Sequence, residues 1–146
     1  MNVIIKPAAL TLGLVAILSI GAALAQDDAL PEGFETAPVL KTTETRDGDP
    51  IAWPEGTAQF ISVIGTIEPG GRTPRHQHPV PVYVYILEGE VELRTEGGDP
   101  HTYSAGEAYI EALNRDHQLF NVSDDEARVL VVFTATEGQP TTVASE

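Results

Sequence analysis

The sequence predicts an all-β protein folded as a small barrel or sandwich. Short segments rich in valine, isoleucine, threonine and aromatic residues recur along the chain, which is typical of strands. Glycine, proline, asparagine and aspartate clusters separate these segments and predict turns. After residue 25 no stretch sustains the apolar period of 3.6 that would indicate a helix. With 146 residues and 42% hydrophobic content, the chain suits one globular domain.

Two N-terminal segments precede that domain. Residues 1–25 carry Lys6, then an apolar stretch, then small residues ending at Ala25, which is the pattern of a cleaved signal peptide. The apolar stretch is short for a membrane-spanning helix. Residues 26–38 are acidic and punctuated by proline and glycine, so we expect a flexible leader. The expected protein is periplasmic or secreted, without membrane contact once the signal peptide is removed.

The composition excludes some partners. The chain has 22 acidic and 8 basic residues, a formal net charge of −14 at pH 7. This charge repels nucleic acid and anionic lipid headgroups, so we expect neither as a partner. The negative charge favours neutral or cationic small molecules as ligands. The alternative interpretation is that the acidic residues only keep the protein soluble. The chain has no cysteine, so the expected export to an oxidising compartment adds no disulfide to its stability.

The expected elements follow one another at short intervals. Residues 39–136 are expected to form the β-barrel domain, and residues 137–146 a polar C-terminal tail. The predicted strands lie at 38–45, 58–67, 82–95 (with a tight turn at Glu88-Gly89), 101–113, 117–122 and 128–136.

Two of these strands are apolar on both faces. They are "YVYIL" at 83–87 and "RVLVVF" at 128–133. A strand of this kind needs cover on both sides, so one face packs inside the barrel and the other meets a partner or the N-terminal segment. A homodimer is therefore expected.

Three histidines fall where such a fold could gather them. His76 and His78 are two residues apart, so on a strand they project from the same face. His117 begins another predicted strand. His101 directly follows a predicted turn and is expected to be exposed. Imidazole suits iron, manganese, zinc and nickel. The pattern predicts one divalent ion, held by the three histidines.

The spacing around these histidines resembles the two sequence motifs of the cupin family. The first motif is a glycine, His-x-His, a glutamate and a second glycine, and its spacings are kept at Gly70, His76, His78, Val82 and Gly89. The second motif is kept at Gly106, His117 and Asn121, with Ala112 and Asn114 in place of its proline and glycine. The resemblance implies a jelly-roll (double-stranded β-helix) barrel with a metal site. Dioxygenases, isomerases and decarboxylases share this scaffold.

The chain departs from the first motif at one metal ligand. The family's glutamate is replaced by Val82, which cannot bind a metal. Either the three histidines work with open positions, or the domain has become a ligand-binding or structural cupin. Glu111 is the first candidate for a replacement ligand or general base, because similar small cupins carry an acidic residue there. A solvated, outward-facing Glu111 is the competing interpretation.

Four further residues are candidates for substrate binding. Gln59 and Gln118 offer amide groups, and Arg75 could attract an anion, or else pair with a nearby glutamate. Asn121 could bind substrate or cap the adjoining loop. The predicted function is a metal-dependent oxygenase or isomerase for a small oxygenated molecule. The alternative is a non-catalytic module that binds a metal or a small ligand.

Overall fold

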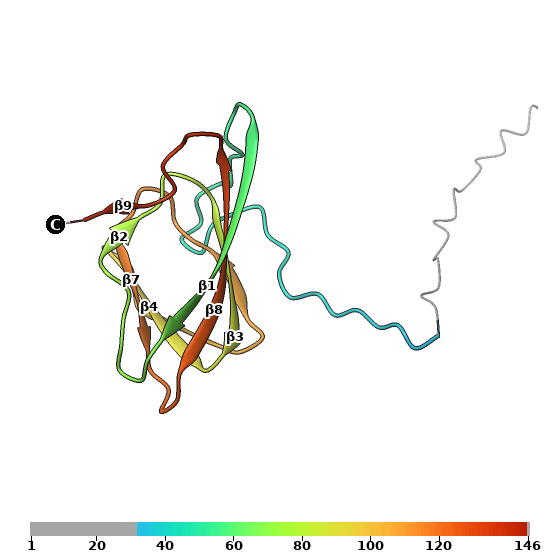
Figure 1. Cartoon of the computed structure of the whole chain (residues 1–146), viewed down its shortest axis with the longest axis vertical. Helices are drawn as coiled ribbons and strands as arrows, with labels where there is room; N and C mark the ends of the chain where they lie inside the picture. Colours follow the sequence, from blue (N-terminus) through green and yellow to red (C-terminus); the bar gives the residue numbers. More distant parts are fainter. Residues whose placement is uncertain (1–31, 146) are drawn as a thin grey trace, which may run out of the picture. The chain divides into compact units, whose positions relative to one another are not determined.

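The β-branched and aromatic segments form nine strands in the computed structural model, which describes residues 32–145 (Figure 1). The barrel belongs to the unit that begins at Thr36. The strands are β1 (Ala58–Ile67), β2 (His76–Gln77), β3 (Val82–Glu88), β4 (Glu90–Thr95), β5 (His101–Ser104), β6 (Ala108–Ile110), β7 (His117–Asn121), β8 (Ala127–Thr136) and β9 (Val143–Ala144).

The strands make two sheets of antiparallel pairs. One sheet has the order β1-β8-β3-β6 and the other the order β5-β4-β7-β2-β9. Neighbours in a sheet come from distant parts of the chain, as where β1 pairs with β8 over its whole length. The predicted all-β, jelly-roll fold is confirmed.

Alternation along the strands builds the core between the sheets. Val82, Val84 and Ile86 of β3 are at most 1% exposed and face inward, where they meet the buried Val91 and Leu93 of β4. The residues between them, such as Tyr83 and Tyr85, are half-buried on the outer face. This period of two divides the apolar side chains of β3 between the core and the outer face of the sheet.

Two turn residues explain the motif positions that they fill. Gly89 joins β3 to β4 with φ of 78°, and an added Cβ would lie 2.9 Å from Ser123 Oγ and 3.0 Å from Ala127 Cα. Asn114 replaces a motif glycine and has φ of 51°, a left-handed conformation that asparagine tolerates better than most residues. Its amide donates to the carbonyl oxygen of His78 at 2.8 Å, which fixes the backbone beside the histidine pair.

Two strand predictions were wrong. Residues 38–45 form no strand; they contribute a single bridge between Glu44 and Pro50, because Thr45 and Gly48 bond within their own turn. Residues 101–113 form β5 and β6 in different sheets, since the chain turns at Gly106.

The structure describes the C-terminal segment up to residue 145 but begins only at residue 32. The C-terminal tail contains β9, which was not expected. The predicted signal peptide and residues 26–31 of the leader lie outside the described residues. Between residues 32 and 145, no helix is both long and apolar enough to span a membrane.

Candidate metal centre

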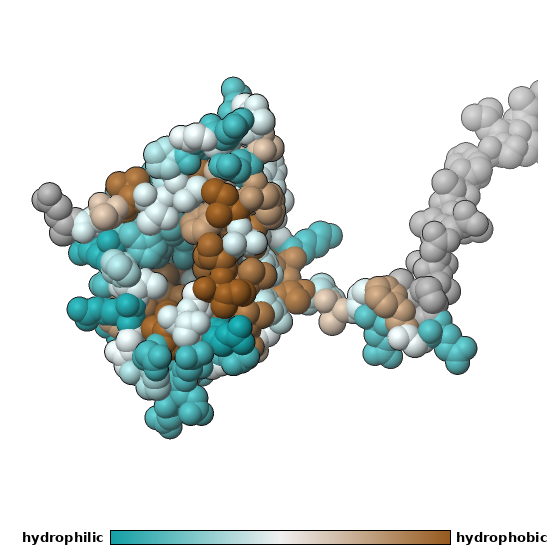
Figure 2. All heavy atoms as spheres, viewed as in Figure 1, coloured by the Kyte–Doolittle hydropathy of each residue, from teal (hydrophilic) through white to brown (hydrophobic). Residues whose placement is uncertain are grey.

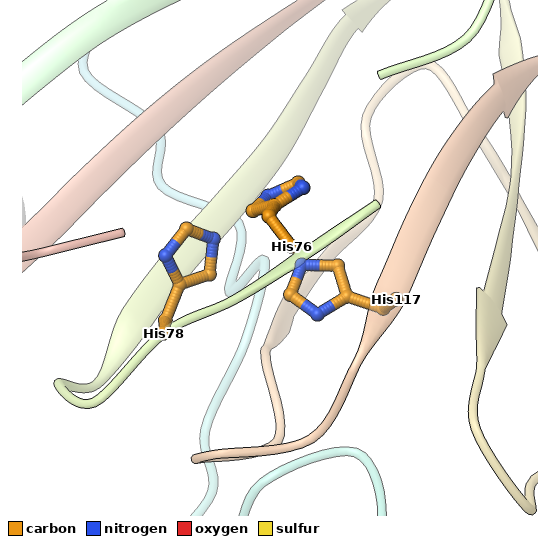
Figure 3. A group of neighbouring side chains, drawn as sticks. All are labelled: His76, His78 and His117. Carbon is orange, nitrogen blue, oxygen red and sulfur yellow. The ribbon is translucent and has the colours of Figure 1, made fainter. Parts of the chain in front are cut away.

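Three histidine side chains meet inside the barrel. His76 on β2 pairs in register with His117 on β7, and His78 follows β2 directly. Their ring centroids are 4.4 to 5.1 Å apart, and one ring nitrogen from each lies within 4.8 Å of the others. Figure 3 shows the three rings close together, with His76 and His78 on one segment of the chain and His117 on β7. His78 and His117 are buried and His76 is half-buried. The structure thus brings together the three histidines of the predicted site.

All three rings are oriented in the same way, through Nδ1. Each Nδ1 lies within hydrogen-bonding distance of a backbone carbonyl oxygen. The pairs are His76 with Pro74 (2.7 Å), His78 with Thr141 (2.6 Å) and His117 with Arg115 (3.0 Å). Because a carbonyl oxygen only accepts, each Nδ1 carries the proton, and in the neutral ring Nε2 keeps its lone pair. Metal-binding histidines are held in this way, so three Nε2 atoms are prepared as ligands.

Glu111 is the fourth group of the cluster. Its side chain is buried, with Oε2 at 3.0 Å from Nε2 of His78 and Oε1 at 3.4 Å from Nε2 of His117. Neither Oε2 of Glu111 nor Nε2 of His117 has a hydrogen-bond partner. With protons on Nδ1 of the neutral rings, the carboxylate and imidazole lone pairs face each other, and the repulsion is relieved by a metal ion between them or by a proton on Nε2. The donor set therefore fits a divalent metal ion.

The ionisation of the cluster agrees with this arrangement. Burial favours a raised pKa for the Glu111 carboxyl, but the hydrogen bonds and charges of His117 and His78 outweigh burial and lower the pKa to about 2. Burial similarly tends to lower the pKa of His117, and Glu111 outweighs it and raises that pKa. Glu111 is therefore a carboxylate at neutral pH, as a metal ligand must be.

Glu111 occupies the place next to the missing motif glutamate. It follows β6, and its amide donates to the carbonyl oxygen of Val82 at 2.9 Å. Since Tyr83 pairs with Ile110, Val82 and Glu111 are the next opposed pair of the same ladder. Opposed residues of antiparallel strands project from the same face of the sheet. Glu111 therefore points inward, and the competing interpretation of a solvated, outward-facing Glu111 is wrong.

The cluster lies at one end of a cavity of ≈ 200 Å³ between the sheets. Most of the other lining side chains are apolar, and Phe133 packs against the His78 ring with centroids 5.4 Å apart. His76, Thr73 and Thr142 also line an outer hollow of ≈ 320 Å³, so the cavity reaches the surface beside His76.

The other predicted site residues lie elsewhere. Gln59 is exposed on β1. Arg75 lines the outer hollow beside His76 and a second hollow, and its guanidinium binds Asp116 at 3.0 Å and Glu96 at 3.1 Å, which is the alternative weighed above. Gln118 donates to the carbonyl oxygen of Thr73 at 3.1 Å. None of the three lines the histidine cavity.

Asn121 has a structural task. It is buried, and its Nδ2 donates to the carbonyl oxygens of Ile67 and Asp125, both at 2.8 Å. Its Oδ1 accepts from the amide and the hydroxyl of Ser123. These bonds use the capacity of the side chain and hold the loop after β7. Loop capping, the other role considered for Asn121, is the one that the structure shows.

The C-terminal segment contributes to the site, and sequence reasoning missed it. β9 pairs with β2, placing Ala144 opposite His76, and the Ser145 amide donates to the carbonyl oxygen of Arg75. The carbonyl oxygen of Thr141 orients His78, and Thr142 lines the cavity. The hydroxyl of Ser145 donates to Asp116. A two-residue strand leaves no hydrophobic pattern, so the sequence offered no signal for it.

Comparisons with known proteins agree with the fold and the cluster. A family described as "Cupin domain" matches residues 63–133, which include strands β2 to β7 and all three histidines. The chain therefore carries a cupin domain. No curated protein matches it significantly.

Solved cupin structures share the fold at low identity. The DMSP lyase DddQ from Ruegeria pomeroyi aligns with a TM-score of 0.51 and 23% identity, over 59% of this chain and 43% of that one. Lactobacillus farciminis oxalate decarboxylase gives 0.52 and 20%, over 58% and 26%. A Bacillus subtilis oxalate decarboxylase, described with Mn(II) centres, gives 0.51 and 23%, over 58% and 23%. The chain thus spans less than half the length of each neighbour.

Proposed function

We propose that His76, His78, His117 and Glu111 bind one divalent metal ion, of iron, manganese, zinc or nickel. The observation that carries this proposal is the shared orientation of the rings, with every Nδ1 on a backbone carbonyl and the Nε2 atoms turned toward each other and Glu111. Imidazole and carboxylate together suit these metals.

The bound ion is proposed to act on a small oxygenated molecule. A divalent ion with open coordination positions polarises a bound oxygen atom, and a redox-active one also activates dioxygen. The chain's own residues hold the ion, reduce its net charge through Glu111, and surround the open positions with apolar walls that limit water.

The cavity favours an oxygenase over an isomerase. Among its lining residues, the four proposed ligands are the only side chains of the acid or base type. Isomerisation needs a positioned acid or base that is free to exchange a proton. Once Glu111 binds the ion, no such group remains in the described lining. A metal-dependent oxygenase is therefore the first candidate, and a non-catalytic module that captures a small ligand, which also needs no acid or base, is the second.

Metal analysis of the full chain, produced without a histidine tag, tests the proposal. Wild-type protein is expected to hold one ion per chain by mass spectrometry and to keep it in a His101→Ala variant, since His101 is exposed on β5. His76→Ala and His117→Ala are expected to lose it. Wild-type protein that stays metal-free after incubation with Fe(II), Mn(II), Zn(II) and Ni(II) would overturn the proposal. Oxygen consumption with diols or diketones then separates the oxygenase from the binding module.

We further propose that the protein is exported and works as a homodimer. Residues 1–25 would direct it to the periplasm or outside the cell, which N-terminal sequencing of the exported form tests. The dimer is proposed from the outer face of the β1-β8-β3-β6 sheet. Phe60 is 75% and Ile64 50% exposed there, and the register places Leu130, Val132, Tyr83 and Tyr85 beside them. Figure 2 shows a hydrophobic patch where β1 and β8 lie.

Light scattering tests the dimer. Ile64→Asp is expected to give monomers, because a buried, unpaired carboxylate is costly at an interface. Val122→Asp is the matched control, since Val122 is 45% exposed in the loop after β7. A wild-type mass of one chain at micromolar concentration would contradict a dimer.

A further inference from the structure

Tyr109 is a buried tyrosine whose hydroxyl has no hydrogen-bond partner. It lies on β6, is 3% exposed, and pairs in register with Val84 of the core. In the described part of the chain, three buried side-chain atoms lack a partner: the Tyr109 hydroxyl, Oε2 of Glu111 and Nε2 of His117. The last two belong to the proposed metal ligands. With the His117 ring protonated on Nδ1, the hydroxyl is the only one of the three that can donate a hydrogen bond.

The backbone places Tyr109 beside Glu111. Residues two apart on a strand project from the same face, so both side chains point into the barrel. Burial first, and then the negative charge of Glu111, raise the pKa of the Tyr109 hydroxyl well above its usual 10. The hydroxyl and the carboxylate are therefore neighbours, although no hydrogen bond of normal geometry joins them.

Tyr109 does not reach the histidine cavity. Glu111 lines that cavity, whereas Tyr109 lines a separate hollow of ≈ 220 Å³ together with Tyr103, His101 and Arg46. A molecule in the cavity would contact Glu111 but not Tyr109. The acceptor within reach of the hydroxyl is therefore Glu111 and not a bound ligand.

The ring of Tyr109 is held in place by Tyr103. The two rings are stacked, with their centroids 4.2 Å apart and their planes at 19°. Tyr103 lies on β5 and is itself buried. Contact between aromatic faces has a preferred geometry as well as apolar area. The stack thus fixes the direction in which the Tyr109 hydroxyl points.

Packing alone does not account for this hydroxyl. Phenylalanine would fill the same space and make the same stack without burying an unpaired polar group, which is unfavourable. A carboxylate that binds a metal through one oxygen keeps acceptor capacity on the other. Carboxylate ligands are in turn hydrogen-bonded by neighbouring groups. Among residues 32–145, the Tyr109 hydroxyl is the one buried side-chain donor that is free for this task.

From these observations we propose that Tyr109 is a positioning residue for Glu111. Its hydroxyl donates a hydrogen bond to the Glu111 carboxylate when the ion is bound, and so holds the carboxylate toward His78 and His117. The inference rests on the proposed metal centre. Tyr109 touches neither the ion nor the molecule that the ion binds. It acts only through Glu111, and its hydroxyl keeps its proton.

The variant Tyr109→Phe tests the role, because it removes the hydroxyl and keeps the ring. Calorimetric titration uses the full chain and the proposed ion that wild type binds most tightly. Affinity is expected to fall by about tenfold or more, which is typical when a group that orients a ligand is lost. Urea denaturation with a chelator present is expected to show unchanged or higher stability, since no existing bond is removed. A tyrosine with only a packing role would give the reverse pattern, with lower stability and unchanged affinity.

Two further variants assign the effect to the hydroxyl and to Glu111. Tyr103→Phe removes the hydroxyl of the stacked neighbour and is expected to keep wild-type affinity. In a Glu111→Val background, adding Tyr109→Phe is expected to change affinity no further, because residues that act as a pair are not additive. Metal binding is also expected to shift the near-ultraviolet absorption of a tyrosine to longer wavelength, and this shift should be absent in Tyr109→Phe.

The outcomes separate the positioning role from the metal centre itself. Wild-type affinity in Tyr109→Phe, beside weakened binding in Glu111→Val, would overturn the role and leave the metal centre standing. An equal loss from Tyr109→Phe with and without Glu111 would also overturn it, because the tyrosine would then act on another group. A wild-type chain that takes up none of the four ions would overturn the metal centre and the positioning role together.

Discussion

Glu111 lies directly opposite Val82 on neighbouring antiparallel strands, with its amide 2.9 Å from the Val82 carbonyl oxygen. In the proposed site, the carboxylate that the cupin motif places on β3 comes instead from the end of β6. Because opposed residues share a face, the exchange moves the carboxylate across one strand spacing and keeps it on the inner side of the barrel. The valine fills the space left on β3, where it is fully buried.

Exchanging the two residues tests this equivalence. Glu111→Val is expected to weaken metal binding by about a hundredfold or more, since a ligand is lost from a buried set of donors. The double variant Glu111→Val with Val82→Glu returns the carboxylate to the same inner face and is expected to recover a large part of the affinity. Calorimetric titration with Zn(II) or Mn(II) measures both.

The exchange has a matched control. Glu126→Gln removes an exposed carboxylate in the loop before β8 and is expected to leave affinity unchanged. Equal affinity of Glu111→Val and wild type would show that Glu111 is not a ligand.

Shortening the C-terminus is the second test. Removing residues 141–146 takes away the carbonyl oxygen that binds Nδ1 of His78 and the strand beside His76. Loss of such an orienting contact typically costs about 10–100-fold in metal affinity. We expect that loss while circular dichroism still reports a β-rich fold, because the core strands β3, β4 and β8 remain.

Two milder variants separate the effect of orienting His78 from the effect of shortening the C-terminal segment. Removing Glu146 alone is expected to change nothing. Ser145→Ala removes the hydroxyl bond to Asp116 and is expected to have a smaller effect than the full truncation. A truncated protein with wild-type affinity would show that the segment has no part in orienting His78.

Replacing Asn121 is expected to lower the free energy of unfolding without changing metal affinity. Asn121→Ala breaks four hydrogen bonds at a buried position, and leaving buried partners unsatisfied costs about 1–3 kcal/mol each. Urea denaturation is expected to show a clear loss of unfolding free energy, with Gln118→Ala as a control that loses a single half-buried bond. Metal affinity below the transition should stay the same; a selective loss of affinity would place Asn121 in the site instead.

Metal affinity is expected to fall as the pH is lowered. Each histidine must be neutral to bind, and Glu111 raises the pKa of His117 above its usual 6.5 in the metal-free protein. Protons therefore compete from above pH 6.5, and below the pKa of His117 affinity falls by about tenfold per pH unit for the proton displaced. Titrations between about pH 5.5 and 8 measure this. In Glu111→Gln the onset should move to lower pH, and an affinity independent of pH would contradict histidine ligation.

Most of the fold and the histidine cluster could be predicted from side-chain patterns in the sequence. Residues 58–67 are rich in β-branched and aromatic residues and are followed by a turn-forming segment, and β1 has those same bounds. His76, His78 and His117 could be grouped because a period of two on short strands fixes which side chains share a face. Glu111 was a candidate through the cupin resemblance, and the sequence left its inward orientation open.

The features that could not be predicted from the sequence depend on backbone hydrogen bonds or on ion pairs between distant residues. Residues 38–45 have strand composition but close turns on themselves, and β9 has no strand composition but pairs through its backbone. Arg75 could not be assigned because its partners, Glu96 and Asp116, lie far from it in the sequence. A polar side chain has no periodic signature that distinguishes a substrate contact from an ion pair.

The three carbonyl contacts of the histidines also imply an order of assembly. His76 and His117 are oriented by residues two positions before them, so their rings can be set as soon as each local turn has formed. His78 depends on Thr141, 63 residues further along the chain. During synthesis, the proposed coordination sphere is completed only when residues 141–145 have docked against β2. Metal uptake at the proposed site would then follow folding of the barrel, and a chain that lacks residues 141–146 would fold its barrel but bind the ion more weakly.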